Sequence, residues 1–522
     1  MRRLAALAAA LVVLAGGGLA VAGCGSGSST TLTVLAGSEI KDLEPLFGDI
    51  QDHTGIKLKP DYVGTIEGTQ EIVDGRDRHD LAWFSHSKYL DLLQQGGPKR
   101  VHAQTPIMLS PVVLGVKRSV ARRLGWAGNP NVTWRDIAEA AKAGKLRFAM
   151  TNPASSNSGF TALVGVASAF AGSADALNSG KIDTEGLRDL FAGQKLTAGS
   201  SGFLADAYVQ SQSVLDGMIN YESVLLSLSA SGKLQDRLEL IYPREGIITA
   251  NYPLLLLNDS KRDEYDKLTE YLLSADFQKK LMKDTLRRPV TPGVPLDPRL
   301  PRALLVELPF PSSVKTIDAI VFAYLNEARP PAHATFVLDV SGSMGSEDRI
   351  VHLKQALRGL AGLDRSITGR FSAFHKREQL SFIPFSSYVQ PAADFTITGT
   401  SSYPAVRAYI DKLTPGGSTA IYSALDQAYR RAATQQAADP RRYYSIVLMT
   451  DGENNSGIGA DDFLSDYRAL PERARRIRTF PILFGEASSD ALQRIADATG
   501  GKLFDARSAS LSEIFKEIRG YQ

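Results

Sequence analysis

Oxygen-bearing side chains follow apolar runs in separate segments of the C-terminal third of the chain. In "TFVLDVSGSM" they occupy every second position, at Asp339, Ser341 and Ser343, while Thr419 lies in "TPGGSTAIYSAL" and Asp451 directly follows "YYSIVLMT". A strand, a turn and a helix cap would explain the first segment alone. Carboxylate and hydroxyl oxygens are also ligands of hard cations, and Mg²⁺ keeps several waters where the protein supplies few charges. Together the segments predict a Mg²⁺ site, with Mn²⁺ or Ca²⁺ as alternatives.

Strand-like and helical patterns alternate around these segments. Strands are expected in "ATFVLDV", "QLSFIPFSS" and "YYSIVLMT", and helices in "DRIVHLKQALRGL", in "PAVRAYIDKL" and after Thr419. The order of these pieces over residues 333–522 resembles a von Willebrand factor A domain that carries a metal-ion-dependent adhesion site. The resemblance implies a doubly wound, Rossmann-like, mostly parallel sheet with helices on both faces.

The same resemblance implies a role for each candidate ligand. Ser341, Ser343 and Thr419 would contact the metal directly, and Asp339 and Asp451 would act partly through waters. Ser418 is the alternative to Thr419, which we prefer from its spacing to "SAL". The ion would keep an open coordination position. The family usually fills that position with a carboxylate from a partner, here a protein or matrix ligand.

Polar side chains also gather in the N-terminal half, where "TNPASSNSGF" precedes a helical pattern. Free backbone N–H groups at the start of that helix would favour a carboxylate or another oxyanion. Simple N-capping, which needs only one of these side chains, is the alternative. Glu39 and Glu222 would repel an anion and suit an amine or sugar hydroxyls, so the identity of the solute stays open. The candidate ligand contacts are Ser38, Glu39, Thr65, Ser85, Ser155, Ser156, Asn157, Ser158, Tyr221, Glu222 and, more weakly, Tyr252.

The elements that would position these side chains form a second α/β pattern. Strands are expected in "TLTVLAG", "KLKPDYV" and "DLAWFSHS", and helices in "IKDLEPLFGDIQDHTG", which ends at Gly55, and "TIEGTQEIVDG". This order predicts a parallel sheet covered by helices. Residues 31–308 resemble a type II periplasmic-binding-protein domain, of the class that delivers solutes to ABC transporters. The resemblance implies two α/β lobes, crossing strands, and a small solute in a cleft closed by a hinge.

The N-terminus, "MRRLAALAAALVVLAGGGLAVAGCGSGSST", has a basic start, an apolar stretch and small residues before Cys24. "VAGC" resembles the bacterial lipobox. This resemblance implies a signal peptide over residues 1–23, lipid on Cys24, and a flexible tether over residues 24–30. The protein would then be anchored to the extracytoplasmic face of a bacterial membrane. Because the apolar stretch is nearly long enough to span a bilayer, an uncleaved signal anchor is the alternative.

Composition and sequence motifs narrow the classes of protein to which this chain could belong. The 522 residues carry a net charge of only +3, so no nucleic-acid partner is expected, and the single cysteine excludes an intrachain disulfide. No G-x-S-x-G, P-loop or H-E-x-x-H motif is present, and an enzyme is not expected. His86 and His102 are expected at the surface. Residues 309–332 are predicted to form a linker helix and a proline-containing, semi-rigid spacer.

Two functions follow from the domain pattern. One is a cell-surface lipoprotein that binds a partner protein or matrix ligand through the metal, with the N-terminal module as a sensing or scaffold domain. The alternative is an extracellular solute receptor of an ABC-type transport system, whose C-terminal domain docks a partner complex.

Overall fold

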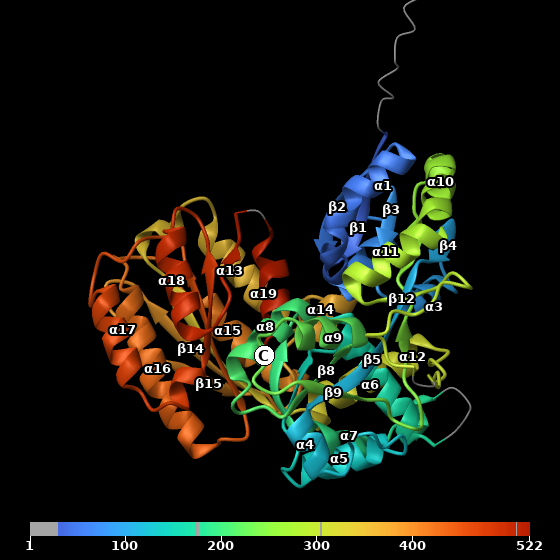
Figure 1. The fold of residues 1–522 in the computed structure, drawn as a ribbon. Helices are drawn as coiled ribbons and strands as arrows, with labels where there is room; N and C mark the ends of the chain where they lie inside the picture. The colour runs from blue at the N-terminus through green and yellow to red at the C-terminus, as the bar shows by residue number, and fades with distance from the viewer. Residues whose placement is uncertain (1–29, 173–176, 303–304, 508) are drawn as a thin grey trace, which may run out of the picture.

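The computed structural model describes residues 30–172, 177–302, 305–507 and 509–522 (Figure 1). The predicted signal peptide, the lipidation site Cys24 and nearly all of the predicted tether lie outside these residues. The described chain forms three α/β bodies, which we call lobe 1, lobe 2 and the C-terminal domain, each built around one sheet. Within the described residues, no helix has the length and apolar character needed to cross a membrane.

Lobe 1 contains a mixed sheet with the strand order β2-β1-β3-β11-β4. Strands β1 to β3 are parallel, as predicted, but β11 is antiparallel to both of its neighbours, β3 and β4, because the chain returns here from lobe 2. The strands are β1 (Thr30–Gly37), β2 (Ile56–Val63), β3 (Leu81–Trp83), β4 (Ala103–Pro106) and β11 (Pro253–Leu256). The helices are η1 (Ser38–Leu46), α1 (Phe47–Thr54), α2 (Thr65–Asp74), α3 (Lys88–Gln94), α10 (Arg262–Leu272) and α11 (Ala275–Thr285).

Two of the predicted helix ends in lobe 1 have a clear physical cause. Gly55 and Gly75 have φ values of +69° and +68°, a left-handed conformation that glycine adopts without steric cost. The backbone N–H of Gly55 bonds back to Gln51, and that of Gly75 bonds to Ile72, which satisfies carbonyls at each helix end. The first of these ends is followed directly by Ile56, the first residue of β2.

Lobe 2 is built around the long strand β5 (Met108–Lys117), and its principal strand order is β10-β5-β8-β6-β7. Its other strands are β6 (Phe148–Thr151), β7 (Gln194–Ala198), β8 (Gly217–Tyr221), β9 (Leu238–Ile241), β10 (Thr249–Ala250) and β12 (Arg288–Pro289). Its helices are α4 (Arg118–Arg123), α5 (Trp134–Lys142), α6 (Asn157–Phe170), α7 (Thr184–Phe191), α8 (Ser201–Ser211) and α9 (Glu222–Ala230). The chain passes between the lobes from β4 to β5 and from β10 to β11, which confirms the predicted crossing strands.

The C-terminal domain has a single sheet in the order β15-β14-β13-β16-β17-β18, parallel except for β15. Helices cover both faces, so the predicted doubly wound architecture is confirmed. The strands are β13 (Ala332–Asp339), β14 (Gln379–Phe385), β15 (Ala393–Thr396), β16 (Tyr443–Thr450), β17 (Arg478–Leu483) and β18 (Phe504–Asp505). The main helices are α13 (Arg349–Arg358), α14 (Ile367–Ser372), α15 (Tyr403–Asp411), α16 (Ile421–Ala438), α17 (Ala460–Ala469), α18 (Ser489–Thr499) and α19 (Leu511–Arg519).

The segment predicted to be a linker is part of the folded core. Helix α12 (Val314–Ala323) and the π-helical turn that follows it (Tyr324–Ala328) bury Ile317, Ile320 and Tyr324 in the core shared by the two lobes. Arg329 is buried as well. The prediction of a semi-rigid spacer is therefore wrong for this structure, because the apolar face of α12 packs against α6 instead of leading away from it.

Lobe 2 and the C-terminal domain share a continuous apolar core. Leu204 and Tyr208 of α8 belong to the same cluster as Phe480 and Phe504 of the C-terminal sheet. The ring of Phe203 meets that of Tyr521 edge-on, with centroids 5.0 Å apart. Figure 1 shows the C-terminal domain packed beside lobe 2, with α8 and α19 close to the contact. The apolar contact fixes the position of α19 relative to the lobes.

Candidate functional site

Asp339 lies at the carboxyl edge of the C-terminal sheet, where the predicted metal ligands converge. It is the last residue of β13 and its side chain is fully buried. The backbone N–H of Ser341 donates to Asp339 Oδ1 at 2.8 Å, and the hydroxyl of Thr450 donates to Oδ2 at 2.6 Å. Both oxygens of the carboxylate are thus oriented by neighbours, which suits a ligand that acts partly through water.

Ser341, Ser343 and Asp451 form a chain of contacts beside Asp339. The two serine hydroxyls are 3.0 Å apart, and the hydroxyl of Ser343 donates to Asp451 Oδ1 at 2.8 Å. Asp451 follows the end of β16, which pairs in parallel with β13. Since parallel neighbours end at the same edge of a sheet, residues 108 positions apart in the sequence meet here.

Thr419 reaches the same place from the loop before α16. Its backbone N–H donates to Asn455 Oδ1 at 2.7 Å, and its carbonyl accepts from the N–H of Asn455 at 3.0 Å. A Cβ placed on Gly452 would lie 3.7 Å from the hydroxyl oxygen of Thr419 and 3.8 Å from that of Ser343. The hydroxyls of Thr419 and Ser343 therefore border one small space. Thr419 is buried, whereas the alternative Ser418 is exposed.

A residue that sequence reasoning missed, Arg349, also reaches this site. Its Nη1 lies 2.9 Å from Asp451 Oδ2, and its Nη2 lies 2.7 Å from Glu347 Oε2. Glu347 and Asp348, which precede it, have φ values of +50° and +55°, strained for residues with a side chain. Arg349 and Asp451 are 102 positions apart, and no spacing pattern could have indicated their ion pair.

The donor set fits a hard divalent cation. Burial raises the pKa of Asp339, and the neighbouring charge of Asp451 adds to this, while hydrogen bonds from Ser341 and Thr450 oppose it. A cation at this edge would relieve the cost of two adjacent buried carboxylates. Among the described residues, no group of three or more His, Cys, Asp or Glu side chains is arranged to hold a metal. This cluster instead combines two carboxylates with three hydroxyls, a set typical of a partly hydrated Mg²⁺.

A second polar cluster lies between the lobes and is centred on Tyr221, at the end of β8. Its hydroxyl is 3.0 Å from Ser85 Oγ, 3.1 Å from Asn157 Nδ2 and 3.4 Å from Glu39 Oε1. Ser85 and Glu39 belong to lobe 1, and Tyr221 and Asn157 to lobe 2. Four of the residues predicted to contact a solute are therefore brought together across the lobes.

The serines before α6 do not follow the simple capping alternative. Ser156 is the N-cap residue, but its side chain makes no capping bond. The hydroxyl of Ser158 lies 2.8 Å from that of Thr151 and 2.7 Å from that of Ser201, so it is held by lobe 2. Ser155 is partly exposed and lines a cavity together with Ser38 of lobe 1.

The remaining predicted contacts have different surroundings. Glu222 is fully buried but ion-paired with Arg288, with 2.7 Å contacts to both oxygens, and it also accepts a bond from Tyr242. It is therefore tied within lobe 2 and turned away from the Tyr221 cluster. Thr65 is buried and its hydroxyl has no hydrogen-bond partner within the described residues. Tyr252, at φ +40° on the chain crossing, packs on Tyr221 with ring centroids 5.9 Å apart.

The position of His86 differs from the predicted one. It is buried, with its ring stacked on Phe310 at 5.3 Å, and burial lowers its pKa to about 3. The prediction that it lies at the surface is wrong, because Phe310, in the segment before α12, packs on its ring. His102 is exposed, as predicted, and its Nδ1 lies 4.0 Å from Asp259 Oδ1.

Comparisons with known proteins agree with this architecture. Residues 32–286 match the family described as bacterial extracellular solute-binding protein, and residues 335–517 match the von Willebrand factor type A domain. The mouse calcium-activated chloride channel regulator 3A-1 is 29% identical over 186 residues, covering 35% of this chain and 18% of that protein. The bovine calcium-activated chloride channel regulator 1 is 27% identical over 195 residues, covering 35% and 19%. The chain thus spans less than a fifth of these curated relatives.

Solved structures with low sequence identity also match each part of the chain. The periplasmic binding protein AfuA from Actinobacillus pleuropneumoniae, with fructose-6-phosphate bound, has a TM-score of 0.45 and 14% identity, covering 58% of this chain and 99% of that one. The von Willebrand factor type A structure from Catenulispora acidiphila has a TM-score of 0.30 and 18% identity, covering 37% and 43%. The two family matches show that the chain is a two-part protein, in which an extracellular solute-binding domain is followed by a von Willebrand factor A domain, abbreviated VWA below.

Proposed function

We propose that the protein is a lipid-anchored cell-surface binding protein whose VWA domain captures a carboxylate of a protein or matrix partner through a Mg²⁺ ion. One observation carries the proposal: loops far apart in the sequence converge at one sheet edge and bring two carboxylates and three hydroxyls together. Ser341, Ser343 and Thr419 would hold the ion directly, and Asp339 and Asp451 would support it. The bound ion would supply an electrophilic position for an acidic group. No step of this function requires covalent chemistry.

Metal binding is the first test. Calorimetry on the full-length protein is expected to detect Mg²⁺ or Mn²⁺ binding, and Asp339→Asn is expected to abolish it, because the variant removes a charge at nearly constant shape. Asp348→Asn is the matched control, since Asp348 is exposed in the same loop and asparagine tolerates its positive φ. Equal Mg²⁺ affinity in wild type and Asp339→Asn would remove the assignment.

The partner and the anchor need separate measurements. A pull-down from cell-envelope extract is expected to recover a partner in Mg²⁺ and to lose it in EDTA or with Asp339→Asn. Mass spectrometry of the membrane fraction is expected to find lipid on Cys24. An unmodified Cys24 in that fraction would refute the anchor and leave the metal site untouched.

A second function, an extracellular solute receptor, is favoured by the cluster around Tyr221. Its residues converge from both lobes, as a solute site between hinged lobes requires. Co-purification with a permease and an ATPase would support transport, while EDTA-sensitive capture of an acidic protein would support adhesion.

A further inference from the structure

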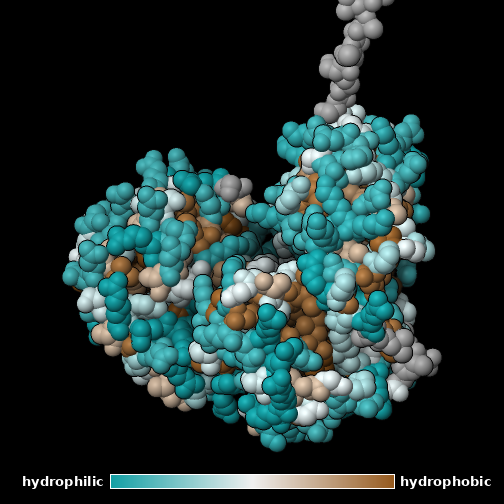
Figure 2. Space-filling view, in the orientation of Figure 1, coloured by the Kyte–Doolittle hydropathy of each residue, from teal (hydrophilic) through white to brown (hydrophobic). Residues whose placement is uncertain are grey.

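A cavity of about 360 Å³ lies where lobe 1, lobe 2 and the VWA domain meet. Lobe 1 contributes Ser38 and Glu67, lobe 2 contributes Ser155 and Ser200, and the VWA domain contributes Lys502 and Lys516, among others. Figure 2 shows the molecule hollowed between the VWA domain and lobe 1, above lobe 2. The cavity is therefore the outer part of the space between the lobes, and the VWA domain closes one side of it.

The VWA domain is held over this space by contacts with both lobes. The backbone N–H of Ile367, at the start of α14, donates to Gln70 Oε1 of lobe 1 at 2.7 Å. The side chain of Asn152 in lobe 2 donates to the carbonyl of Arg519 at 3.2 Å. A Cβ on Gly520 would lie 2.6 Å from the hydroxyl of Ser155, so the end of α19 approaches lobe 2 more closely than a side chain would allow. A molecule in the cavity would touch α19 as well as the lobes.

The two lysines that line the cavity already have acidic partners. Lys502 Nζ lies 2.5 Å from Glu517 Oε1, and Lys516 Nζ lies 2.5 Å from Asp364 Oδ2. Neither lysine is therefore left to attract an anionic ligand. Glu517 and Asp364 neutralise the positive charge that the two lysines of the VWA domain bring to the cavity.

Glu67 differs from the other charged residues of the cavity. It makes no hydrogen bond or ion pair within the described residues, although it lies in the first turn of α2 and lines the cavity. Burial, followed by the charges of Glu513, Glu71 and Glu517, raises its pKa to about 7, against a smaller opposing effect of Lys516. Glu39, beside Ser38 and Tyr221, likewise forms no ion pair with any described residue. Lobe 1 thus presents Glu67 at the cavity and Glu39 nearby, two carboxylates that no cation of the described residues neutralises.

We propose that this cavity binds a small organic cation that carries hydroxyl groups, that Glu67 holds its amine, and that α19 of the VWA domain forms one wall of the binding site. The proposal rests on the second function above, the solute receptor. Hydroxyls of Ser38, Ser155 and Ser200 would meet those of the ligand. A ligand held in this way ties the two lobes and the VWA domain together.

Glucosamine, glucose and glucuronate have similar sizes but are cationic, neutral and anionic, so their affinities report the effect of ligand charge. Each sugar is titrated into the full-length protein by calorimetry. Wild type is expected to bind glucosamine about tenfold more tightly than glucose and to bind glucuronate least, since one charge-assisted hydrogen bond accounts for about that ratio. Glu67→Gln is expected to remove this preference and Glu67→Asp to retain most of it. Glu270→Gln, at an exposed position of α10 in lobe 1 and outside the cavity lining, is the matched control.

A second substitution tests whether the VWA domain forms part of the binding site. Glu517→Gln would leave Lys502 without its partner at the cavity and is expected to weaken glucosamine binding about tenfold. Glu472→Gln is the control, because Glu472 is also ion-paired in the VWA domain but lies outside this cavity. If Glu517→Gln binds glucosamine as wild type does, the VWA domain does not form part of the site.

The outcomes distinguish this proposal from the functions on which it rests. Preferred binding of glucuronate would overturn the cation assignment and leave a solute receptor in place. Failure of all three sugars to bind would overturn the chemistry assigned to the cavity. Mg²⁺ titration of the same samples reports on the metal site independently, and thermal unfolding confirms that each variant is folded.

Discussion

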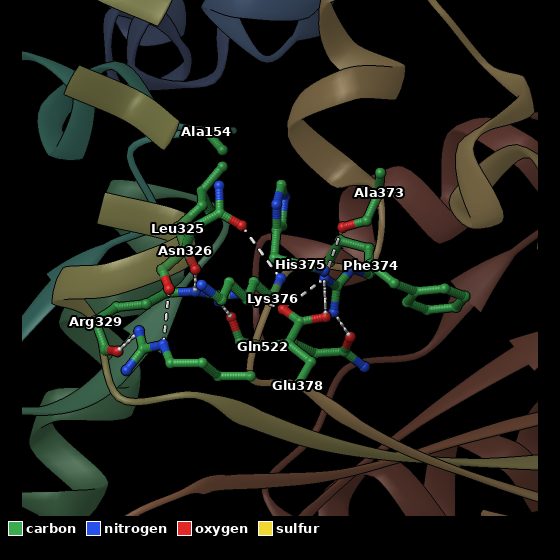
Figure 3. Close-up of polar contacts among 12 residues, drawn as sticks. Ala154, Leu325, Asn326, Arg329, Ala373, Phe374, His375, Lys376, Glu378 and Gln522 are labelled. Atoms are coloured by element: carbon green, nitrogen blue, oxygen red, sulfur yellow. Dashed lines mark hydrogen bonds and ion pairs between the residues drawn. The ribbon is translucent and has the colours of Figure 1, made fainter. Parts of the chain in front are cut away.

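A buried carboxylate joins the segment after α12, the sheet and the last helix of the VWA domain (Figure 3). Glu378 accepts hydrogen bonds from Arg519 Nη2 at 2.8 and 2.7 Å and from the backbone N–H of His375 at 3.0 Å, and it also pairs with Arg329. All three charged side chains are almost completely buried. Arg329 and Arg519 also donate to the carbonyl and to the side-chain oxygen of Gln522, respectively. Glu378→Gln would leave two buried guanidinium groups facing a neutral amide.

Two independent arguments give the expected loss of unfolding free energy in Glu378→Gln. Burial alone would raise the pKa of Glu378, but Arg519 and Arg329 hold it at about 2, against an ordinary value of 4.5. At about 1.4 kcal/mol for each unit of pKa, the charged form is stabilised by about 3 kcal/mol. Removing one partner of a buried ion pair costs about 3–5 kcal/mol in other proteins. We therefore expect Glu378→Gln to lower the free energy of unfolding by about 3 kcal/mol.

Urea denaturation, followed by fluorescence, measures this difference. Glu327→Gln is the matched control, because Glu327 is exposed two residues before Arg329, and a change within about 0.5 kcal/mol is expected for it. The folded-state pKa of Glu378 is depressed, so its contribution is complete above about pH 4.5 and is lost as the pH falls towards 2. The stability difference between wild type and Glu378→Gln should shrink across that interval. A difference below 1 kcal/mol near neutral pH, or one that does not change on acidification, would refute the reasoning.

Two further substitutions probe the metal site and the packing. Arg349→Met is expected to tighten Mg²⁺ binding about tenfold in calorimetry, since it removes a positive charge that is paired with a candidate ligand. Arg358→Met, at the other end of α13, is the control and should leave the Mg²⁺ affinity unchanged. Equal Mg²⁺ affinities in wild type and both variants would contradict this role of Arg349. Gly501→Ala is expected to lower the free energy of unfolding by about 3 kcal/mol, because its Cβ would lie 1.7 Å from the carbonyl oxygen of Thr479. Gly202→Ala, whose Cβ meets nothing within 4 Å in α8, should be neutral or slightly stabilising, and similar denaturation midpoints for both variants would contradict the packing argument.

Several structural features followed directly from local sequence patterns. The apolar run before Asp339 forms a buried parallel strand, and the glycine at 55 ends the first helix in the left-handed conformation. Strand and helix periodicity also indicated the two α/β parts and their order along the chain. These features depend on neighbouring residues, so they can be read without knowledge of distant contacts.

Other expectations failed where a distant segment decided the outcome. The α12 segment was predicted to be a linker because prolines follow it, but its apolar face is buried by α6. Glu222 was predicted to contact a solute, but its carboxylate is ion-paired with Arg288 inside lobe 2. In both cases the packing or ion-pair partner comes from an element distant in the sequence, and that partner determined where the side chains lie.

The sequence by itself determined which residues could bind a cation, since side-chain chemistry and strand ends are local properties. Only the tertiary structure decided which charges are neutralised. Arg349 reaches Asp451 across 102 positions, and Glu67 has no ion-pair partner within the described part of the chain, since the lysines of the opposite wall bind other acids. Ion pairing depends on distance and burial in three dimensions, and spacing along the chain fixes neither quantity for residues so far apart.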